Sequence, residues 1–385
     1  MKFFHLSDLH IGKQLHHYNL IPEQRDILGR IVALAEKEQP DAILIAGDIY
    51  DTPVPSAEAV SVFDAFLTAL NNLTPAVTIC VIAGNHDSAK RIDFASGILA
   101  KHRVVIAGMP PTVPEEKLKK VCISDSYGEV CIYLLPFVKP SFVRNLTEEE
   151  IQTYDDAVRL VIERESIDTE KRNIIISHQF YTAEGKEPET SDSEIRMVGG
   201  IENVDVSVLE PFDYAALGHI HRKQKIGHEK NCYCGTPLQY SVSEAGDEKT
   251  VTMVELLEKG SKPCITELPL EPLRRVRKLT GHLEEILEAA SEENCHDYVS
   301  ITLTDEVEAY QPKEKLEQVY DHILEIKIDN ERTRNILEFS EDETESLDPY
   351  EAFLKFFSEM NGRSLTEKED TVLRMVLNGE REVSE

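Results

Sequence analysis

Short motifs of metal-ligating residues recur along the first two-thirds of the 385-residue sequence. They are Asp8-Leu9-His10, Gly47-Asp48, Asn85-His86-Asp87, His178 and His219-Ile220-His221. Carboxylate and amide oxygens together with imidazole nitrogens suit divalent ions such as Mn²⁺, Fe²⁺ or Zn²⁺. Alternate residues of an extended chain point the same way, so Asp8 and His10 are expected to approach one site together, as are His219 and His221. The motifs therefore indicate a metal centre in which one carboxylate can bridge two ions.

Each motif taken alone has a simpler explanation. A single histidine at the end of a strand is more often a surface residue than a ligand, and Asn-His-Asp is common in turns. Asp48 on its own is most simply the N-cap of a following helix. The recurrence of such residues after successive strands is what favours a two-metal site.

The elements that must position these motifs read as alternating strands and helices. Buried strands are expected over residues 3–6, 42–46, 77–83, 173–177 and 214–217, each directly before one motif. Amphipathic helices are expected over 22–38, 57–73 and 148–165. Ligands of open α/β sheets bind at the carboxyl ends of the strands. We therefore expect an α/β fold, a layered β-sheet core flanked by helices, with the metal centre at one sheet edge.

The second part of the chain differs in character. A boundary is expected near Pro269–Pro272, followed by a small α+β module with helices over 281–290 and 313–320 and strands over 298–303 and 323–328. Residues 340–346 read as a charged linker, and 348–360 and 366–377 as two short helices that dock on a partner or on the main body. The expected domains are residues 1–270, 271–337 and 338–385.

Composition narrows the class of protein further. Apolar residues make up 41% and charged residues 29% of the chain, which is typical of a soluble globular protein. No stretch is apolar enough to cross a bilayer and no signal peptide is apparent, so we expect a cytoplasmic protein. The net charge of −30 argues superficially against nucleic acid as a ligand. Seven scattered cysteines do not form a disulfide framework, and we expect them to be reduced.

The ordered motifs resemble those of the calcineurin-like metallophosphoesterases, D-x-H, G-D, G-N-H-[DE], H and G-H-x-H. The resemblance implies that Asp8, His10, Asp48 and His221 hold one ion, and that Asp48, Asn85, His178 and His219 hold the other. It also implies that His86 contacts the scissile phosphate and that Asp87 orients His86. Two such ions can clamp a phosphate and activate water, so the implied reaction is phosphoester hydrolysis.

The opening Phe4–Lys13, the run Gly47–Asp51 and the acidic tail resemble more specifically the SbcD family, the nuclease subunits of bacterial SbcCD complexes. That resemblance implies an Mn²⁺-dependent exonuclease on double-stranded DNA ends with endonuclease action on single strands or hairpins. It also implies an SbcC-like ATPase partner bound through the C-terminal helices and a role in DNA repair and recombination. Residues 271–337 would form a capping domain that positions DNA over the site, and residues 57–73 with their neighbours would form a homodimer. Archaeal and eukaryotic relatives often have histidine at position 51, which leaves the role of Asp51 open.

The residues themselves define the substrate less sharply than the reaction. The arginine of the Ser/Thr phosphatase motif G-D-x-V-D-R-G is missing after Asp48. Basic or aromatic residues that could meet DNA phosphates follow the motifs, at Lys13, His16, His17, Tyr18, Lys90, Arg91, Arg222, Lys223, Lys225 and 274–278, although a solvated surface would look the same. Two alternatives remain: an enzyme acting on a small nucleotide or other phosphodiester, and a DNA-binding scaffold with vestigial metals.

Overall fold

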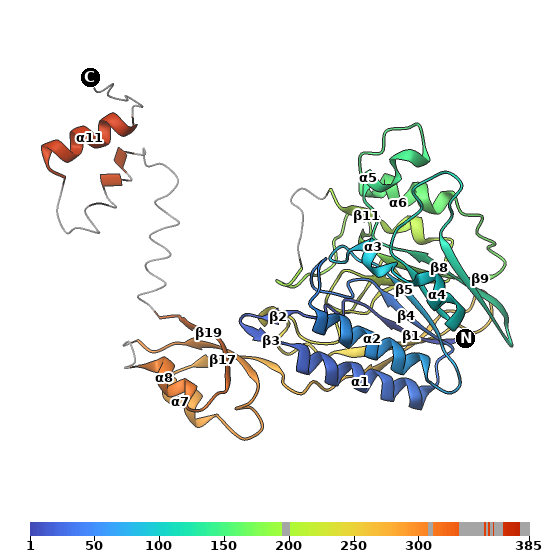
Figure 1. Ribbon diagram of the computed structural model, residues 1–385. Helices are drawn as coiled ribbons and strands as arrows, with labels where there is room; N and C mark the ends of the chain where they lie inside the picture. Colours follow the sequence, from blue (N-terminus) through green and yellow to red (C-terminus); the bar gives the residue numbers. More distant parts are fainter. Residues whose placement is uncertain are drawn as a thin grey trace. The chain divides into compact units, whose positions relative to one another are not determined.

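The computed structural model describes residues 1–194, 201–306 and 311–330, and near the C-terminus residues 350, 351, 353, 354, 357 and 365–377 (Figure 1). These residues fall into two compact units. One comprises Met1–Leu279, Ala290–Ser300 and Glu317–Glu325, and the other Thr280–Ala289, Ile301–Leu316 and the described part of Ile326–Glu385. Among the described residues, no helix combines the length and apolar character that crossing a bilayer requires.

The first sheet has six strands in the order β16-β15-β1-β4-β5-β6. Their bounds are Cys264–Pro269 (β16), Thr250–Glu255 (β15), Lys2–Leu6 (β1), Ala42–Ala46 (β4), Thr78–Ile82 (β5) and Val104–Ala107 (β6). Strands β1, β4, β5 and β6 are parallel, whereas β15 runs antiparallel to β1. The helices α1 (Ile21–Glu38) and α2 (Ala57–Asn71) provide the crossovers between β1, β4 and β5. The carboxyl ends of these strands therefore meet at one edge.

The second sheet also has six strands, in the order β13-β14-β12-β9-β8-β7. Their bounds are Gln224–Ile226 (β13), His228–Tyr233 (β14), Tyr214–Gly218 (β12), Arg172–His178 (β9), Gly128–Leu135 (β8) and Lys119–Asp125 (β7). Strands β8, β9, β12 and β14 are parallel, and β9 and β12 are in register with His178 opposite Gly218. This register places His178 and the His219-Ile220-His221 motif side by side at the carboxyl ends of β9 and β12.

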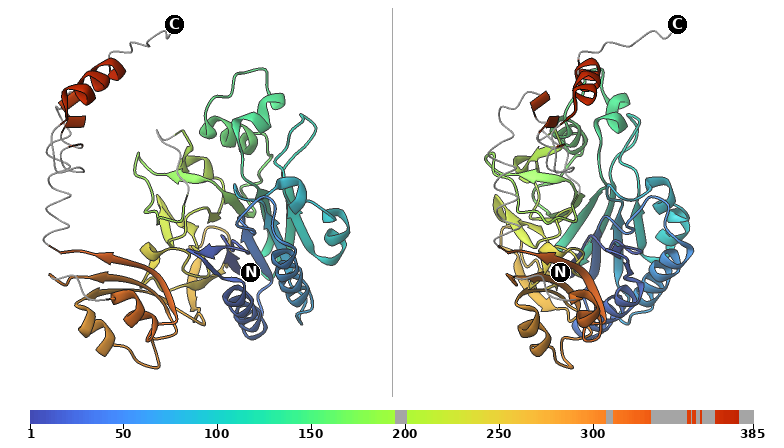
Figure 2. Two further views of the ribbon diagram at one scale, coloured as in Figure 1. Left: turned by 60° about the vertical axis from the view of Figure 1, so that its left-hand side comes forward. Right: turned by 90° about the vertical axis from the view of Figure 1, so that its left-hand side faces the viewer.

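The two sheets pack face to face because both faces of their central strands are apolar. On one face, Leu44 and Ile82 of the first sheet form a core cluster with Ile132 and Ile176 of the second. On the other face of the first sheet, residues such as Ile43 pack beneath α1 and α2. The outer face of the second sheet is covered by α6 (Tyr154–Glu163). Figure 2 shows the helices outside the paired sheets. Burial of each large apolar side chain in these layers contributes about 1.5–3 kcal/mol to the free energy of folding.

Local sequence signals explain where the long helices begin. α1 has Pro22 in its first turn, and the side chain of Ser56 caps α2 by accepting from the Ala59 N–H at 3.1 Å. The helix expected over 148–165 begins only at Tyr154, because Thr153 and Asp156 form a capping box at that point. The strands and helices expected to carry the motifs are otherwise confirmed, with ends shifted by a few residues.

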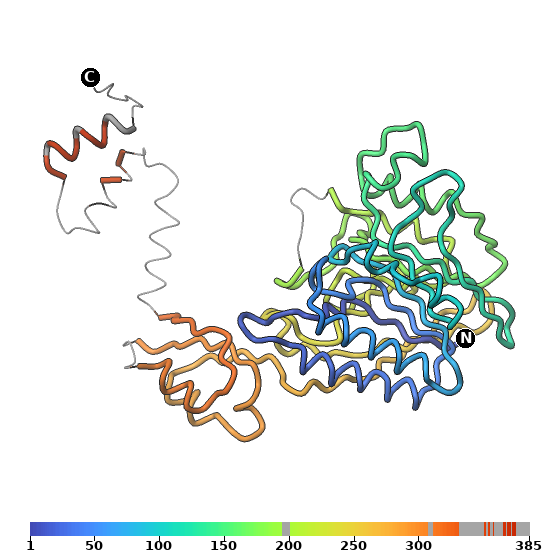
Figure 3. The backbone as a smooth tube through the Cα atoms, viewed as in Figure 1, coloured from blue at the N-terminus to red at the C-terminus, as the bar shows by residue number. Residues whose placement is uncertain are grey.

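Smaller elements connect the layers, as the backbone trace in Figure 3 shows. The short helices are α3 (Ala89–Ile92), α4 (Ser96–Leu99) and α5 (Pro140–Val143), with 3-10 turns at Ala100–His102, Arg144–Leu146, Val206–Leu209 and Val242–Glu244. Two two-stranded sheets pair β2 (Gln14–Leu15) with β3 (Tyr18–Asn19) and β10 (Phe180–Thr182) with β11 (Asn203–Asp205).

The expected α+β elements beyond Pro272 are present. Strands β17 (Val276–Gly281), β18 (Tyr298–Leu303) and β19 (His322–Ile328) form a three-stranded sheet, and the helices are α7 (Leu283–Glu288) and α8 (Pro312–Glu317). Strand β17 was not predicted from the sequence. Its residues alternate between less and more exposed positions, but only Val276 is buried and the next two residues are basic, so no apolar alternation is visible. The second tail helix is confirmed as α11 (Glu367–Leu377). The linker 340–346 and most of the first tail helix, 348–360, lie outside the described residues.

The expectation that all seven cysteines are reduced is wrong for one pair. Cys122 and Cys131 form a disulfide between β7 and β8. The two residues are directly opposite partners in the antiparallel pair, which sequence spacing alone did not reveal. The other cysteines are free, and Cys80, Cys232 and Cys234 are buried.

Candidate metal centre

The motifs converge at the carboxyl ends of β1, β4, β5, β9 and β12, drawn from both sheets. Six of the expected ligands are buried: Asp8, His10, Asp48, His178, His219 and His221. Asn85 and His86 are partly exposed. A cluster of two carboxylates and four imidazoles that has lost most of its contact with water requires a compensating interaction.

The backbone that presents these residues differs from the expected one. Asp8, His10, Asp48 and His219 have φ angles of 52°, 42°, 50° and 95°, which extended strands do not have. The extended conformation expected for Asp8-x-His10 and His219-x-His221 is therefore wrong, although the side chains do converge. Hydrogen bonds from Asp8 N to Gly47 O (3.0 Å) and from His10 N to Asp48 O (2.9 Å) hold the first loop against the second. Strained backbone of this kind clusters at functional sites.

The first group of ligands surrounds His10. Its Nε2 lies 3.1 Å from His221 Nε2 and 3.7 Å from Asp48 Oδ2. Ligand atoms of Asp8, His10 and His221 all lie within 4.8 Å of one another. The carboxylate of Asp8 also accepts the backbone N–H of His219 at 3.1 Å, which fixes its orientation. Three side chains from two sheets thus share one small volume.

The second group surrounds His178. Its Nε2 lies 2.9 Å from Asn85 Oδ1 and 3.3 Å from Asp48 Oδ2, while His219 Nδ1 lies 3.0 Å from the same Asn85 oxygen. His178 Nδ1 lies 2.7 Å from the carbonyl oxygen of Ala46, which can only accept, so Nδ1 carries hydrogen. The neutral ring then presents its Nε2 lone pair to Asn85 and Asp48. A lone pair that faces oxygen atoms in this way requires either a proton or a metal ion between them.

The electrostatics of the centre favour a positive charge on the ring of His178. Burial opposes protonation of His178, but the nearby carboxylates of Asp48 and Asp8 outweigh it and raise the pKa of His178 to about 9. The same carboxylates would attract a metal ion, which competes with the proton for Nε2. The residues present therefore fit divalent metal ions, and Asp48 is the natural bridge because it approaches His10 as well as His178.

A glycine makes room for the Asp48 carboxylate. A Cβ atom on Gly84 would collide with Asp48 Oδ1 and with the backbone nitrogen of the same residue. Only glycine allows the third motif to approach the second this closely. Glycine directly before Asn85 and His86 is thus a steric requirement of this site.

His86 lies beside the two groups and is held through one ring nitrogen. Its Nδ1 donates to the backbone carbonyl of Asp51 at 2.9 Å, and its ring meets the His10 ring edge to face with centroids 4.9 Å apart. Its backbone N–H donates to Asp48 Oδ1 at 2.8 Å. The side chain is therefore oriented with Nε2 available, and the backbone independently positions the bridging carboxylate.

The orienting role expected for Asp87 needs correction. Its carboxylate accepts three backbone N–H groups, from Ile49 and Tyr50 at 3.0 Å and from Gly84 at 2.9 Å. The ring of His86 is held by Asp51 instead. Asp87 thus connects the loop after β4 to the loop after β5, because its carboxylate accepts N–H groups from both. Among the described residues, no hydrogen bond joins Asp87 to the His86 ring.

Asp51, whose role the sequence left open, has two partners in the structure. Its Oδ1 lies 2.9 Å from Lys13 Nζ and 3.5 Å from His10 Nδ1. Although burial opposes ionisation, these two groups lower the pKa of Asp51 to about 2. Asp51 therefore lies near His10 Nδ1, while the other ring nitrogen of His10 faces His221 and Asp48.

Sequence reasoning missed two further acidic residues near the centre. Glu194 Oε1 accepts the backbone N–H of His221 at 2.7 Å, and burial together with Asp8 and Glu244 raises the pKa of Glu194 to about 7. Glu244 is fully buried, and despite that burial His221 and Lys249 hold the pKa of Glu244 well below its usual range. Neither residue belongs to a spaced motif, so no sequence signal could have identified it.

Several basic residues expected to face DNA are occupied within the protein. Arg222 pairs with Asp247 at 3.3 Å, Lys223 with Glu267 and Arg274 with Glu23. Within the described parts of the chain, no ion pair involves Lys90, Arg91, Lys225, Arg275 or Lys278. These five residues, rather than Arg222, Lys223 and Arg274, are the better candidates for binding the phosphates of a nucleic acid.

Family comparisons agree with this geometry. Residues 1–223 match the family described as calcineurin-like phosphoesterase, and residues 269–361 match the family described as type 5 capsule protein repressor C-terminal domain, SbcD_C. Among curated proteins, the chain is 32% identical over 384 residues to the D subunit of nuclease SbcCD from Staphylococcus epidermidis, and the match covers 98% of both chains.

Solved structures show weaker likenesses. Protein TT1561 of Thermus thermophilus is 11% identical, with a TM-score of 0.41, and the match covers 69% of this chain and 98% of that one. A dimetal phosphatase from Danio rerio is 14% identical, with a TM-score of 0.39, and the match covers 71% of this chain and 98% of that one.

Proposed function

Because the chain belongs to the calcineurin-like phosphoesterase family, in its SbcD branch, we propose that it is a DNA nuclease with a two-metal centre. It would act as a double-strand exonuclease and as a single-strand or hairpin endonuclease in DNA end processing. The observation that carries the proposal is the convergence of His10 and His178 on the single carboxylate of Asp48.

Seven side chains would hold the metals, with Mn²⁺ as the proposed ion. Asp8, His10, Asp48 and His221 would bind one ion, and Asp48, Asn85, His178 and His219 the other, as the motifs of the family imply. In the structure, ligand atoms of Asp8 lie within 4.8 Å of those of His10 and His221 and also of those of Asp48 and His178. Two divalent ions in such a site supply Lewis-acid activation of the phosphodiester and lower the pKa of an attacking water. The buried imidazoles and carboxylates fix their positions before substrate arrives.

His86 would act on the leaving group. The Asp51 carbonyl holds Nδ1–H, so Nε2 is the atom that can carry a proton toward the departing oxygen. His86 is partly exposed, which allows a substrate phosphate to reach it, whereas His10 and His178 are buried. The division between buried ligands and an accessible acid suits hydrolysis of a large substrate.

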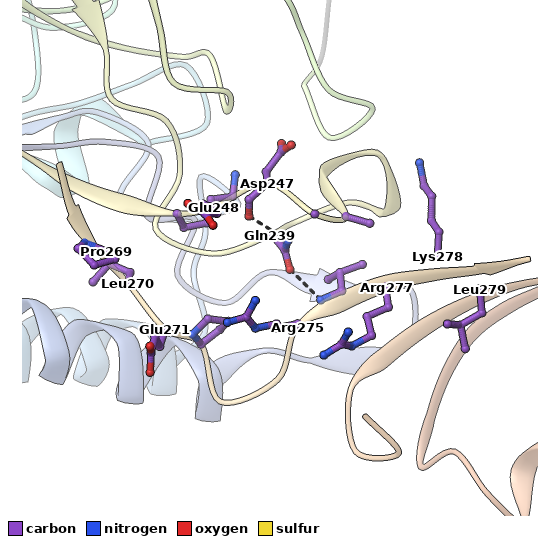
Figure 4. Close-up of a pocket in the computed structure, with 15 residues that line it drawn as sticks. Gln239, Asp247, Glu248, Pro269, Leu270, Glu271, Arg275, Arg277, Lys278 and Leu279 are labelled. Carbon is purple, nitrogen blue, oxygen red and sulfur yellow. Dashed lines mark hydrogen bonds between the residues drawn. The ribbon is translucent and has the colours of Figure 1, made fainter. Parts of the chain in front are cut away.

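A cavity at the start of β17 offers basic side chains that suit DNA as that substrate. Its volume is about 510 Å³, and Arg275, which precedes β17, and Lys278, which lies in it, line the cavity (Figure 4). The Gln239 side chain holds this segment by accepting the Val276 N–H at 2.7 Å. The lining residues Asp247, Glu248 and Lys249 also line a second cavity of about 430 Å³, to which His221 contributes. Arg275 and Lys278 would bind backbone phosphates in the first cavity, and the shared lining residues connect it to the cavity at His221.

The proposed ATPase partner would bind the C-terminal helices. Phe353, Phe357, Leu365, Val372 and Leu373 line an apolar cavity of about 470 Å³, and the Val372 side chain is 59% exposed. Exposed apolar side chains gathered in one groove suit a protein-binding surface. We assign it to an SbcC-like ATPase and place the complex in the cytoplasm, where DNA and ATP are available.

A homodimer is a further part of the proposal. Val60 on α2 is 44% exposed, and Phe94 and Ile98 are 81% and 65% exposed on the segment that follows β5. Pairing of two copies would cover these apolar side chains. Such a dimer would present two cleavage centres to DNA.

The test is cleavage of end-labelled duplex DNA by the purified chain in Mn²⁺, with and without the ATPase. We expect stepwise release of nucleotides from the ends and opening of hairpins. Asp48→Asn, prepared in parallel, excludes a contaminating nuclease if it is inactive. Hydrolysis of small phosphodiesters without any cleavage of DNA would instead identify an enzyme for small substrates.

A further inference from the structure

A cluster of polar side chains lies behind His221, outside the set of expected ligands. It comprises Ser191, Ser193, Ser241, Glu244 and Lys249, and all but Ser193 are buried. Glu244 Oε1 accepts from Ser193 Oγ at 2.8 Å and from Ser241 Oγ at 3.0 Å, and Oε2 accepts from Lys249 Nζ at 2.7 Å. The carboxylate is thus a fully occupied acceptor.

Ser193 connects this cluster to His221. Its Oγ lies 2.7 Å from His221 Nδ1, 2.8 Å from Glu244 Oε1 and 2.8 Å from Ser191 Oγ. A hydroxyl has one hydrogen and two acceptor lone pairs, and an ionised carboxylate can only accept. Ser193 therefore donates to Glu244 and accepts from its other two neighbours. All of its hydrogen-bonding capacity is used only if His221 Nδ1 carries hydrogen.

This arrangement determines which ring nitrogen of His221 faces the ligands. With hydrogen on Nδ1, the lone pair of neutral His221 is on Nε2, the atom 3.1 Å from His10 Nε2. The backbone of His221 is held as well, because its N–H donates to Glu194 and its carbonyl accepts from Lys249 Nζ at 3.3 Å. The ring and the backbone are thus constrained from separate directions.

We propose that Ser193 and Glu244 are positioning residues for metal binding, which fix the tautomer and the orientation of His221 through the relay Glu244–Ser193–His221. The inference rests on the proposed two-metal function. Groups that hydrogen-bond a metal-ligating histidine typically change metal affinity by about 10- to 100-fold. Only the ion held by His221 should be affected, because no residue of the relay contacts His178 in the described structure.

The experiment is a titration of Mn²⁺ alone into the metal-free full-length chain, followed by calorimetry and by electron paramagnetic resonance of free Mn²⁺. We expect Ser193→Ala to weaken one of two sites by about 10- to 100-fold and to leave the other unchanged. Ser193→Thr keeps the hydroxyl and should restore the affinity. Ser241→Ala is the matched control, because Ser241 also donates to Glu244 but has no contact with His221 among the described residues.

A second measurement separates this inference from the proposed function. The tautomer of His221 can be read from nuclear magnetic resonance spectra of metal-free protein containing ¹⁵N-histidine, with the His221 signals assigned by their loss in His221→Asn. We expect hydrogen on Nδ1 in the parent chain and a mixture of the two tautomers in Ser193→Ala. Hydrogen on Nε2, or unchanged Mn²⁺ affinities in Ser193→Ala, would overturn the inference. Failure of the parent chain to bind two Mn²⁺ ions would instead contradict the proposed function, while the tautomer still tests the relay.

Discussion

Replacement of His86 by alanine separates metal binding from catalysis in this site. The backbone N–H of residue 86, which positions Asp48 at 2.8 Å, is retained in the variant. The ring contacts the Asp51 carbonyl and the edge of His10, and one of its nitrogens lies within 4.8 Å of ligand atoms of His10 and Asp51. It supplies no atom to the two groups that contain Asp8. We therefore expect His86→Ala to fold and to bind two Mn²⁺ ions.

The magnitude of the lost activity follows from the role of the available Nε2. A positioned general acid contributes about 10²- to 10⁴-fold to a rate, which corresponds to about 3–5 kcal/mol in the barrier. The loss should appear in kcat more than in KM, because the proton is needed only as the leaving oxygen departs. His228→Ala, which removes an exposed histidine of β14, is the matched control and should retain full activity.

The assay compares two substrates that differ in their leaving group. Hydrolysis of a phosphodiester in duplex DNA expels a basic sugar alkoxide that needs a proton, whereas bis-p-nitrophenyl phosphate releases a weakly basic phenolate that does not. His86→Ala should therefore lose most of its activity on DNA and little on the activated ester. Equal losses on both substrates would refute the general-acid role, and full activity on DNA would remove His86 from the mechanism.

Three further predictions follow from the same structure. Asp48→Asn should abolish tight binding of both ions in Mn²⁺ calorimetry, because the bridging oxygen approaches both groups, and retention of one tight site would show that the ions do not share it. Arg275→Gln combined with Lys278→Gln should lower the slope of log affinity for DNA against log salt by about 2, whereas Lys262→Gln, an exposed control, should not. Ending the chain before residue 347 should abolish pull-down of the ATPase and leave Mn²⁺ binding intact, and undiminished pull-down would assign the tail another role.

Much of the centre was predictable because its ligands follow strands that sequence patterns identify well. The apolar run Ala42–Ala46 and the glycine after it predicted both a buried strand and the position of Asp48 at its end. Parallel pairing then required the motifs after β1, β4 and β5 to meet. The resemblance to a known family supplied the pairing of motifs from the two sheets, which no single segment encodes.

The failures have physical causes that operate over long sequence separations. The extended conformation expected for Asp8 and His10 is wrong because their backbone N–H groups donate to the carbonyls of residues 47–48, which holds the first loop at positive φ. The hydrogen-bond partner of the His86 ring is the backbone carbonyl of Asp51. Every residue has such a carbonyl, so the amino-acid sequence could not identify this partner. Glu244 reaches Ser193 across 51 residues of sequence, so only the folded chain reveals the pair.

The most direct test of the two-metal centre is a crystal structure of the chain grown with Mn²⁺, with the ions located by anomalous scattering. We expect two peaks on either side of the Asp48 carboxylate, about 3.5–4 Å apart. One should contact His10 and His221, and the other His178 and His219. A single peak, or peaks that do not contact Asp48, would contradict the account.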